Sequence, residues 1–210
     1  MILYSALYDE RDPFGCFSEV KTVWDEDQLK EGGVLVLWGG EDISPSLYGQ
    51  KKSSYTYASN KPSKRDVYET QLAKAAVDKG IPIIGVCRGA QLMCALSGGS
   101  LIQDVTGHTG GRHNIVDKNG LSLITNTIHH QMMNLKNTKH ELIAWAPEPL
   151  SSHYIVEGDI EVEVEVEPEI VFFKETNALA IQGHPEYLTP SNAFVKYCTS
   201  LIKEKFNVVS

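Results

Sequence analysis

Short apolar runs alternate along the chain with segments whose apolar residues recur at helical spacing. Residues 34–38 form an almost wholly apolar run that ends in Gly39-Gly40, and residues 81–86 form another. Such runs are typical of strands that are buried on both faces of a sheet. Residues 65–79 have helical spacing instead, and Gly80 suits the end of that helix. The alternation of the two patterns predicts an α/β fold.

The second half of the chain is richer in predicted strands. Residues 160–167 alternate Ile or Val with Glu, which predicts a strand with one face in solvent rather than an acidic binding site. Residues 178–182 predict another short strand. The last helix is expected to begin with Thr189 as its cap and Pro190 in its first turn. Its apolar stripe consists of Phe194, Tyr197, Cys198, Leu201 and Ile202.

Length and charge narrow the class of protein. A chain of 210 residues without an internal repeat or a Gly/Ser-rich linker predicts a single domain over residues 1–210. The net charge of -8 argues against nucleic acid or an anionic membrane as a partner. No apolar run has the length needed to span a bilayer. Residues 1–7 lack the basic residues of a signal peptide and predict a first buried strand.

The cysteines bear on the cellular compartment. Cys16, Cys87, Cys94 and Cys198 form no CxxC pair and no regular framework, so we expect reduced thiols and a cytoplasmic location. Cys94 and Cys198 lie among apolar helical residues and are predicted to belong to the core. Nothing in the sequence assigns a role to Cys16.

Cys87 lies in Gly85-Val86-Cys87-Arg88-Gly89, which joins a predicted buried strand directly to a predicted helix. A sharp turn of this kind, here called the elbow, exposes its central side chain at the carboxyl edge of a sheet, and the glycines leave room for neighbouring backbone. The helix N-terminus favours a thiolate, and backbone N–H groups there can bind an oxyanion. An arbitrary cysteine is more often a small core residue, but this context predicts a nucleophile.

A thiol nucleophile needs a base that later protonates the leaving nitrogen. Of the seven histidines, His184 fits best, because it follows a predicted strand in Gln182-Gly183-His184-Pro185-Glu186. Residues two apart at a strand end point the same way, so Glu186 can reach the imidazole and fix its tautomer. Together with the elbow, this motif predicts a triad of Cys87, His184 and Glu186.

The other histidines are interpreted differently. His129 and His130 lie in residues 126–131, a predicted loop after a strand, where they either position substrate or pack within the loop. Their spacing shows no third ligand and no supporting carboxylate, so no metal site is predicted. The remaining histidines are interpreted as ordinary polar residues: His108, His113, His140 and His153.

Four segments carry a resemblance that covers nearly the whole chain: residues 39–49, residues 65–69, residues 85–99 with Gln103-Asp104, and residues 182–186. On these segments the chain resembles the class I glutamine amidotransferase-like superfamily, and within it the γ-glutamyl hydrolase branch. The resemblance implies a flavodoxin-like three-layer α/β sandwich. Its central sheet would be mainly parallel, with extra antiparallel strands.

The resemblance also implies roles for individual residues. The oxyanion donors would be the backbone N–H groups of Gly40 and Arg88. Relatives usually carry an aromatic residue where Gly183 stands, so a wider pocket is expected beside the triad. No metal or organic cofactor is implied. The residues to which the resemblance assigns substrate binding are Gly39, Gln91, His129 and His130.

The implied reaction is the hydrolysis of a small-molecule γ-glutamyl substrate through a γ-glutamyl thioester on Cys87. A large leaving amine means a free-standing γ-glutamyl amide hydrolase, whereas ammonia means a glutaminase subunit that supplies a separate synthetase. The absence of a synthetase domain from these 210 residues favours the first alternative. A catalytically inert binding protein and a small cysteine peptidase are further alternatives, because fold does not determine substrate.

Residues 51–65 bear on the leaving group, because they carry cations and no acidic residue in an otherwise acidic chain. They follow the predicted oxyanion strand, which suggests that they receive an anionic leaving group, such as a phosphoramidate or a γ-glutamyl-nucleotide amidate. The alternative is a solvated loop whose charges aid solubility. The cations are Lys51, Lys52, Lys61, Lys64 and Arg65, with Tyr55 and Tyr57 interleaved.

Overall fold

The computed structural model describes residues 1–7 and 11–208. Its strands are β1 (Ile2–Ala6), β2 (Glu19–Val23), β3 (Gly33–Leu37), β4 (Ile83–Val86), β5 (Ser100–Ile102), β6 (Asp104–Val105), β7 (Arg112–Asp117), β8 (Ser122–Asn126), β9 (Met132–Asn134), β10 (His140–Trp145), β11 (Tyr154–Ile155), β12 (Pro168–Phe173) and β13 (Ala178–Ile181). Its helices are α1 (Lys64–Asp78), α2 (Arg88–Leu96) and α3 (Ala193–Phe206). Short 3-10 turns are η1 (Glu26–Gln28), η2 (Pro45–Tyr48), η3 (Glu157–Asp159) and η4 (Pro185–Tyr187).

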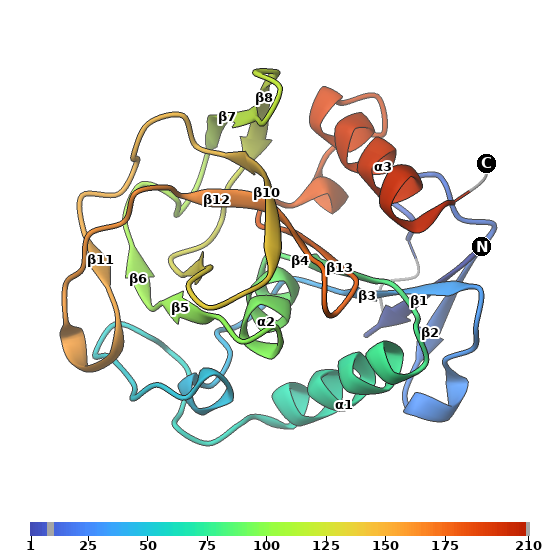
Figure 1. The fold of residues 1–210 in the computed structure, drawn as a ribbon, viewed down its shortest axis with the longest axis horizontal. Coiled ribbons are helices and arrows are strands. Elements are labelled where there is room, and N and C mark those ends of the chain that lie inside the picture. The colour runs from blue at the N-terminus through green and yellow to red at the C-terminus, as the bar shows by residue number, and fades with distance from the viewer. Residues whose placement is uncertain (8–10, 209–210) are drawn as a thin grey trace.

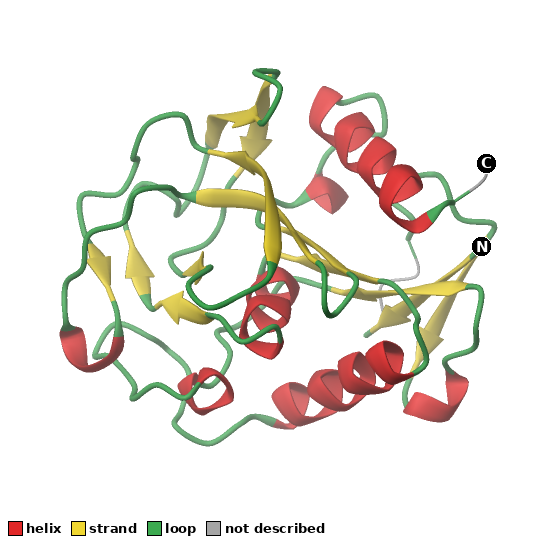
Figure 2. Cartoon of the chain, in the orientation of Figure 1, coloured by secondary structure: helices red, strands yellow, loops and turns green. Residues whose placement is uncertain are grey.

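Within the described residues, nine strands form one sheet in the order β2-β1-β3-β4-β13-β12-β10-β7-β8 (Figure 1). The first five strands in that order run parallel, and the other four extend the sheet in antiparallel fashion. Helices α1 and α2 lie on one face of the sheet and α3 lies on the other (Figure 2). This layered arrangement confirms the predicted α/β fold.

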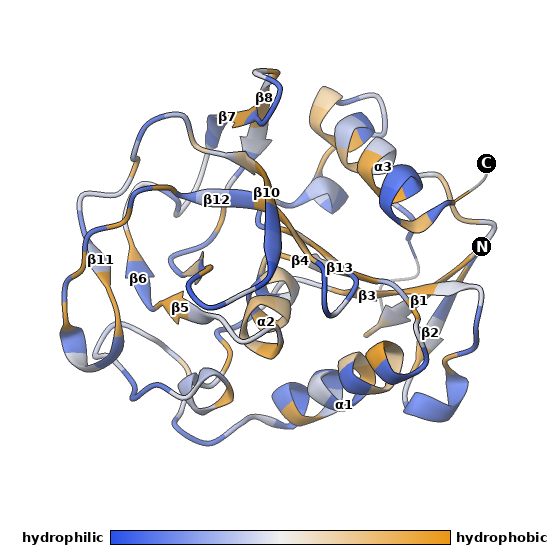
Figure 3. Cartoon of the chain, in the orientation of Figure 1, coloured by the Kyte–Doolittle hydropathy of each residue, from blue (hydrophilic) through white to orange (hydrophobic). Residues whose placement is uncertain are grey.

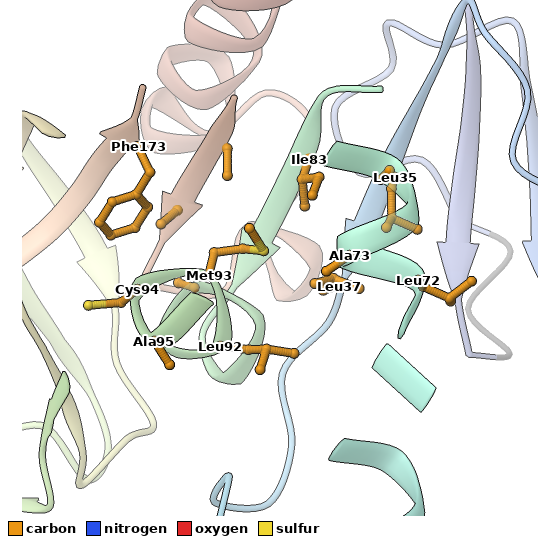
Figure 4. Packing of buried hydrophobic residues seen from close by; sticks show 14 of the residues in the cluster. Leu35, Leu37, Leu72, Ala73, Ile83, Leu92, Met93, Cys94, Ala95 and Phe173 are labelled. Atoms are coloured by element: carbon orange, nitrogen blue, oxygen red, sulfur yellow. The ribbon is translucent and has the colours of Figure 1, made fainter. Parts of the chain in front are cut away.

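The central strands are buried on both faces, which explains their unbroken apolar sequences. Leu35 and Leu37 of β3 pack toward α1 and α2 together with Ile83 of β4 (Figure 4). Val34 and Val36 point to the opposite face and pack toward α3. Side chains alternate between the faces of a strand, so a strand covered twice must be apolar throughout (Figure 3). The predicted strands at residues 1–7, 34–38, 81–86 and 178–182 are confirmed.

Helix α1 begins at a capping box in which the Ser63 side chain accepts from Asp66 N–H and the Asp66 side chain accepts from Ser63 N–H. Its buried face carries Leu72, Ala73 and Ala76, but also Asp66 and Glu69. Apolar spacing alone did not reveal those two carboxylates.

A buried charge network joins α1 to the first residue of α2. The Arg88 side chain is 2% exposed and pairs with Asp66 at 2.5 Å between Nη2 and Oδ1. It also pairs with Glu69, which accepts from Arg65 Nε at 2.9 Å. Because buried charges persist only when they are compensated, this network fixes the start of α2 against α1.

The predicted strand at residues 160–167 is wrong. Apart from an isolated bridge between Ile155 and Glu161, this segment lacks strand pairing in the described part of the chain. Val162 and Val164 still pack inward, against a small cluster that contains Tyr154. The alternation of apolar residues with glutamate therefore reflects the burial of one side of this segment, not hydrogen bonding to a neighbouring strand. The last glutamate of the row, Glu167, is 2% exposed and is not part of a solvated face.

The predicted start of the last helix is also wrong. Helix α3 begins at Ala193, and its cap is Asn192, whose side chain accepts from Phe194 N–H at 2.8 Å. Thr189 and Pro190 lie before the cap in a turn closed by a hydrogen bond from Asn192 N–H to the Thr189 carbonyl. Within the helix, Phe194, Cys198, Leu201 and Ile202 of the predicted apolar stripe are buried, whereas Tyr197 is only partly buried.

All four cysteines lie in the described residues and carry free thiols. Cys94 and Cys198 are fully buried, as predicted, and burial raises the pKa of the Cys94 thiol to about 12. None of the helices in residues 1–7 and 11–208 combines the length and the apolarity needed to cross a membrane.

Replacing Glu69 with Ala should strongly destabilise the fold, because Arg88 would keep its buried charge and lose one of its carboxylates. We expect a loss of about 3–5 kcal/mol in the free energy of unfolding, measured by urea denaturation. As a control, Glu175→Ala removes an exposed ion pair with Lys139 and should leave the midpoint nearly unchanged. Equal, small effects of both substitutions would contradict the role given to the network.

Candidate active site

Cys87 lies at the elbow between β4 and α2 with φ 49° and ψ −106°. A positive φ outside glycine is unfavourable and persists only where the surroundings enforce it. The Cys87 N–H donates to the Ile181 carbonyl of β13 at 2.8 Å. A Cβ at Gly85 would lie 2.5 Å from the Gly89 carbonyl oxygen, and a Cβ at Gly89 would lie 2.1 Å from that of Leu37. The predicted elbow and its need for flanking glycines are therefore confirmed.

His184 and Glu186 follow β13 at the same edge of the sheet. His184 Nδ1 lies 2.7 Å from Glu186 Oε1, and both side chains are 6% exposed. A Cβ at Gly39 would lie 2.7 Å from His184 Cε1 and 3.5 Å from Cys87 Cβ, so the imidazole and the thiol meet at the end of β3. The structure thus brings the three predicted triad residues together, with Glu186 orienting the His184 imidazole.

The charge state of His184 follows from its neighbours. Burial acts to lower the pKa of His184, but the Cys87 sulfur and the Glu186 carboxylate outweigh burial and raise it to about 10. His184 is therefore an imidazolium at neutral pH. An imidazolium beside a thiol at a helix N-terminus favours the thiolate, which is the reactive form.

Gly40 and Arg88 flank Cys87 on two different segments. Arg88 is the first residue of α2 and follows Cys87 directly. Gly40 has φ 150°, and a Cβ there would lie 2.1 Å from Arg65 Nη1. The Arg65 guanidinium also donates to two carbonyl groups at the end of β3, including that of Gly39, at 2.9 Å each. These are the two segments predicted to supply oxyanion N–H groups, and their donor role stays a prediction.

Gln91 and His129 share one partner near the triad. Gln91 Nε2 donates to the Gln131 carbonyl at 2.9 Å, and His129 Nδ1 lies 2.9 Å from the same oxygen. Both side chains are buried, with His129 6% exposed. Burial and the neighbouring His108 hold the pKa of His129 well below its usual value, so this imidazole is neutral. Substrate binding by Gln91 and His129 stays a prediction.

His130 lies at a pocket beside the oxyanion segments and is held by two carboxylates. Its Nε2 lies 3.0 Å from Asp42 Oδ1, and its Nδ1 lies 3.2 Å from Asp104 Oδ1. The hydrogen bond that the Asp42 carboxylate accepts from the His130 ring raises the pKa of His130 despite partial burial. Both ring nitrogens are thus engaged, and Tyr57 packs against the ring with a centroid distance of 4.8 Å, so substrate binding by His130 stays a prediction.

Two residues near the triad escaped the sequence reasoning. Asn126 clamps the backbone of His184 through Nδ2 to the carbonyl at 2.9 Å and through Oδ1 to the N–H at 3.1 Å. Tyr187 stacks on the His184 ring with a centroid distance of 5.0 Å. Tyr187 follows Glu186 directly, so its nearness could have been inferred, whereas Asn126 is far away in sequence and gave no such signal.

The wider pocket expected at Gly183 is wrong. A Cβ there would lie 2.2 Å from Thr125 Oγ1 and 3.1 Å from the Asn126 carbonyl oxygen. Thr125 therefore fills the space into which a larger side chain would project. Glycine at this position reflects the close approach of β8 to the triad loop.

A pocket of about 730 Å³ opens beside the oxyanion segments. Its lining includes the cations of Lys61, Arg65 and Arg88 and the carboxylates of Glu41, Asp42 and Asp66, together with Gly40 and Tyr57. The basic stretch at residues 51–65 therefore reaches this pocket only in part, and the predicted triad residues are not among those that line it. Of its other cations, Lys51, Lys52 and Lys64 do not line this pocket.

Three buried side chains near the triad could hold a metal ion: His108, His129 and Glu169. His108 follows β6, His129 follows β8, and Glu169 belongs to β12. The interpretation of His108 as an ordinary polar residue missed this cluster, because sequence spacing cannot relate three such distant segments.

Comparison with known proteins assigns the family. Residues 26–186 match the Peptidase C26 family, and the chain belongs to it. "Putative glutamine amidotransferase Rv2859c" of Mycobacterium tuberculosis is 31% identical over 163 residues, which are 72% of this chain and 50% of that protein. Protein NtpR of Enterococcus hirae is 43% identical over 72 residues, 34% of this chain and 29% of that protein. This chain spans half or less of the length of these curated relatives.

Solved structures show the same fold at low sequence identity. PurLQS from Thermotoga maritima superposes with a TM-score of 0.62 at 12% identity, covering 98% of this chain and 97% of that one. A glutamine amidotransferase from the same organism gives 0.59 at 13% identity, covering 97% and 96%. The predicted class I glutamine amidotransferase-like superfamily is confirmed, and the chain is a glutamine amidotransferase-like member of the Peptidase C26 family.

Titration of His184 tests the geometry of the triad. In an NMR titration of the histidine ring protons, the resonance of His184 should change with a midpoint near pH 10. That resonance is assigned as the one that disappears in His184→Asn. In Glu186→Gln the midpoint should move lower, because the carboxylate that favours the imidazolium is gone.

The stabilising contribution of this proton should be complete below the ordinary pKa of 6.5 and lost as pH rises through about 10. Chemical denaturation of wild type and Glu186→Gln across that range measures this contribution. A His184 midpoint near 6.5 in the wild type would contradict the imidazolium form.

Proposed function

We propose that this chain hydrolyses a γ-glutamyl amide through a γ-glutamyl thioester on Cys87. The observation that carries the proposal is the thiol at a positive-φ elbow, beside a His184 oriented by Glu186. A nucleophile, a base and a group that orients the base are what acyl transfer requires. Membership of a glutamine amidotransferase-like family supports a γ-glutamyl carbonyl as the electrophile.

The proposed reaction has two halves. The Cys87 thiolate attacks the γ-carbonyl carbon, and the backbone N–H groups of Gly40 and Arg88 receive the oxyanion. His184 gives its proton to the leaving nitrogen as the C–N bond breaks, which leaves the thioester. The neutral imidazole then takes a proton from water as that water attacks the thioester. Glutamate departs, and the thiolate and imidazolium are restored.

The pocket beside Gly40 and Arg88 supports a leaving group larger than ammonia. Its volume of about 730 Å³ is in the range of sites for organic ligands. Lys61 offers a cation for a phosphoryl group, and Tyr57, which is 84% exposed, offers a ring for stacking. An anionic leaving group such as a phosphoramidate or nucleotide-linked amide fits these features.

A second candidate is a glutaminase subunit that delivers ammonia to a separate synthetase. The carbamoyl phosphate synthase small chain of Buchnera aphidicola favours it, at 26% identity over 120 residues. This alternative predicts slow turnover of glutamine by the isolated chain and faster turnover once a partner is bound.

Glutamate release from a substrate panel distinguishes the candidates. The panel contains glutamine, γ-glutamyl amines, γ-glutamyl peptides and a γ-glutamyl phosphoramidate. We expect rapid turnover of one extended amide and a loss on the order of 1,000-fold or more in Cys87→Ala, because the nucleophile is gone. Slow turnover of glutamine alone would favour the subunit, and silence toward every substrate would reject both candidates.

Lys61→Gln tests the anionic leaving group. Loss of the cation should raise KM for the phosphoramidate about 10-fold, the effect of one charged hydrogen bond, with kcat little changed. Lys52→Gln is the matched control, because Lys52 belongs to the same basic stretch but does not line the pocket. If Lys61→Gln affects neutral and anionic amides equally, the stretch is a solvated loop.

A further inference from the structure

A buried polar cluster lies next to the strand that leads to His184. His108 is 0% exposed, His129 6% and Glu169 2%. One ligand atom from each residue lies within 4.8 Å of the other two. The backbone carbonyl of Glu169 accepts from Gln182 N–H at 2.8 Å, so the cluster borders the loop that carries the base.

In each histidine of the cluster, one of the two ring nitrogens already has a hydrogen-bond partner. His108 Nε2 lies 3.1 Å from Glu167 Oε2, and His129 Nδ1 lies 2.9 Å from the Gln131 carbonyl. In metal sites, a ligating imidazole characteristically donates its other N–H to a carboxylate or a carbonyl group. These contacts therefore supply the supporting shell of a metal site.

The third candidate ligand is oriented in the same way. Glu169 Oε1 lies 2.9 Å from His113 Nε2, so Oε2 is the carboxylate oxygen that remains available to bind an ion. His113 itself packs edge-on against His108, with ring centroids 5.1 Å apart. The carboxylate is thus held in place with one oxygen available.

The remaining ring nitrogens and carboxylate oxygen of the cluster lack good hydrogen-bond partners. Among the residues that the structure describes, His129 Nε2 and Glu169 Oε2 have no hydrogen-bond partner. His108 Nδ1 lies 3.8 Å from Glu169 Oε1 and makes a long contact of 3.5 Å with Thr127 Oγ1. That hydroxyl also donates to the His108 carbonyl at 2.8 Å. Buried polar atoms without partners cost free energy, and a shared cation would satisfy them together.

We propose that His108, His129 and Glu169 bind a divalent transition-metal ion, zinc in the first instance. Two imidazoles and one carboxylate are a donor set that zinc favours, with a fourth position left for water. Small side-chain rotations would bring the three donors to the usual zinc distances of about 2.0–2.2 Å. The carboxylates of Glu167 and Glu169 together balance the charge of a dication in this buried place.

Such an ion would also steady the loop beside the catalytic site. The Gln131 carbonyl joins His129 to Gln91. A metal that fixes His129 therefore fixes the backbone oxygen that holds the Gln91 side chain. The alternative for the cluster is a metal-free network in which the histidines hydrogen-bond with the two glutamates and with backbone carbonyl groups.

Zinc titration of the full chain carrying Cys87→Ala separates these alternatives. That substitution removes a thiol that could itself bind zinc beside His184. After chelator treatment, competition with a chromophoric zinc chelator should show one tight equivalent, and zinc should raise Tm. Cobalt in place of zinc should give the visible absorption of a four-coordinate site. None of these readouts depends on hydrolysis, so they are independent of the proposed function.

Variants in the same Cys87→Ala background assign the ligands. Glu169→Gln and His129→Asn should each weaken zinc binding at least about 100-fold, and Glu167→Gln about 10–100-fold. His140→Asn is the control, because His140 contacts Thr138 and lies outside the cluster. Circular dichroism confirms folding, and Glu167→Gln serves if the Glu169 variant does not fold. Absence of a tight equivalent, or affinity unchanged in the cluster variants, would overturn the proposal.

Discussion

Arg88 carries a full positive charge to a place where its side chain is 2% exposed, and Asp66 and Glu69 of α1 compensate it there. The same Glu69 holds Arg65, whose guanidinium binds carbonyl groups at the end of β3. One ion-pair network thus fixes the start of α2 and the end of β3 relative to each other. These are the two segments that flank Cys87, so the geometry around the thiol rests on charges that burial makes costly to separate.

The parallel half of the sheet explains why distant residues meet. Strands β3, β4 and β13 are neighbours and run in the same direction, so their carboxyl ends share one edge. Gly39, Cys87 and His184 each lie just beyond one of these ends. Ligand sites of open α/β sheets form at such edges, which here requires only that three strand ends lie side by side.

The antiparallel half of the sheet adds contacts that support the segment carrying His184. Strand β8 ends at Asn126, which clamps the His184 backbone, and Thr125 of the same strand fills the space beside Gly183. Strand β12 delivers Glu169 next to β13. The triad therefore sits between a conventional α/β core on one side and a polar, histidine-rich layer on the other.

The sequence by itself determined where the buried strands and the elbow lie and that His184 is near Glu186. In each case the interacting residues are close in the chain: continuous apolar runs, glycines on either side of Cys87, and a carboxylate two positions from an imidazole. Only the tertiary structure decided the burial of Asp66 and Glu69, the unpaired segment at residues 160–167 and the convergence of His108 with Glu169. Apolar periodicity records that a side chain is buried but not which strand or charge it meets, because those partners come from elsewhere in the chain.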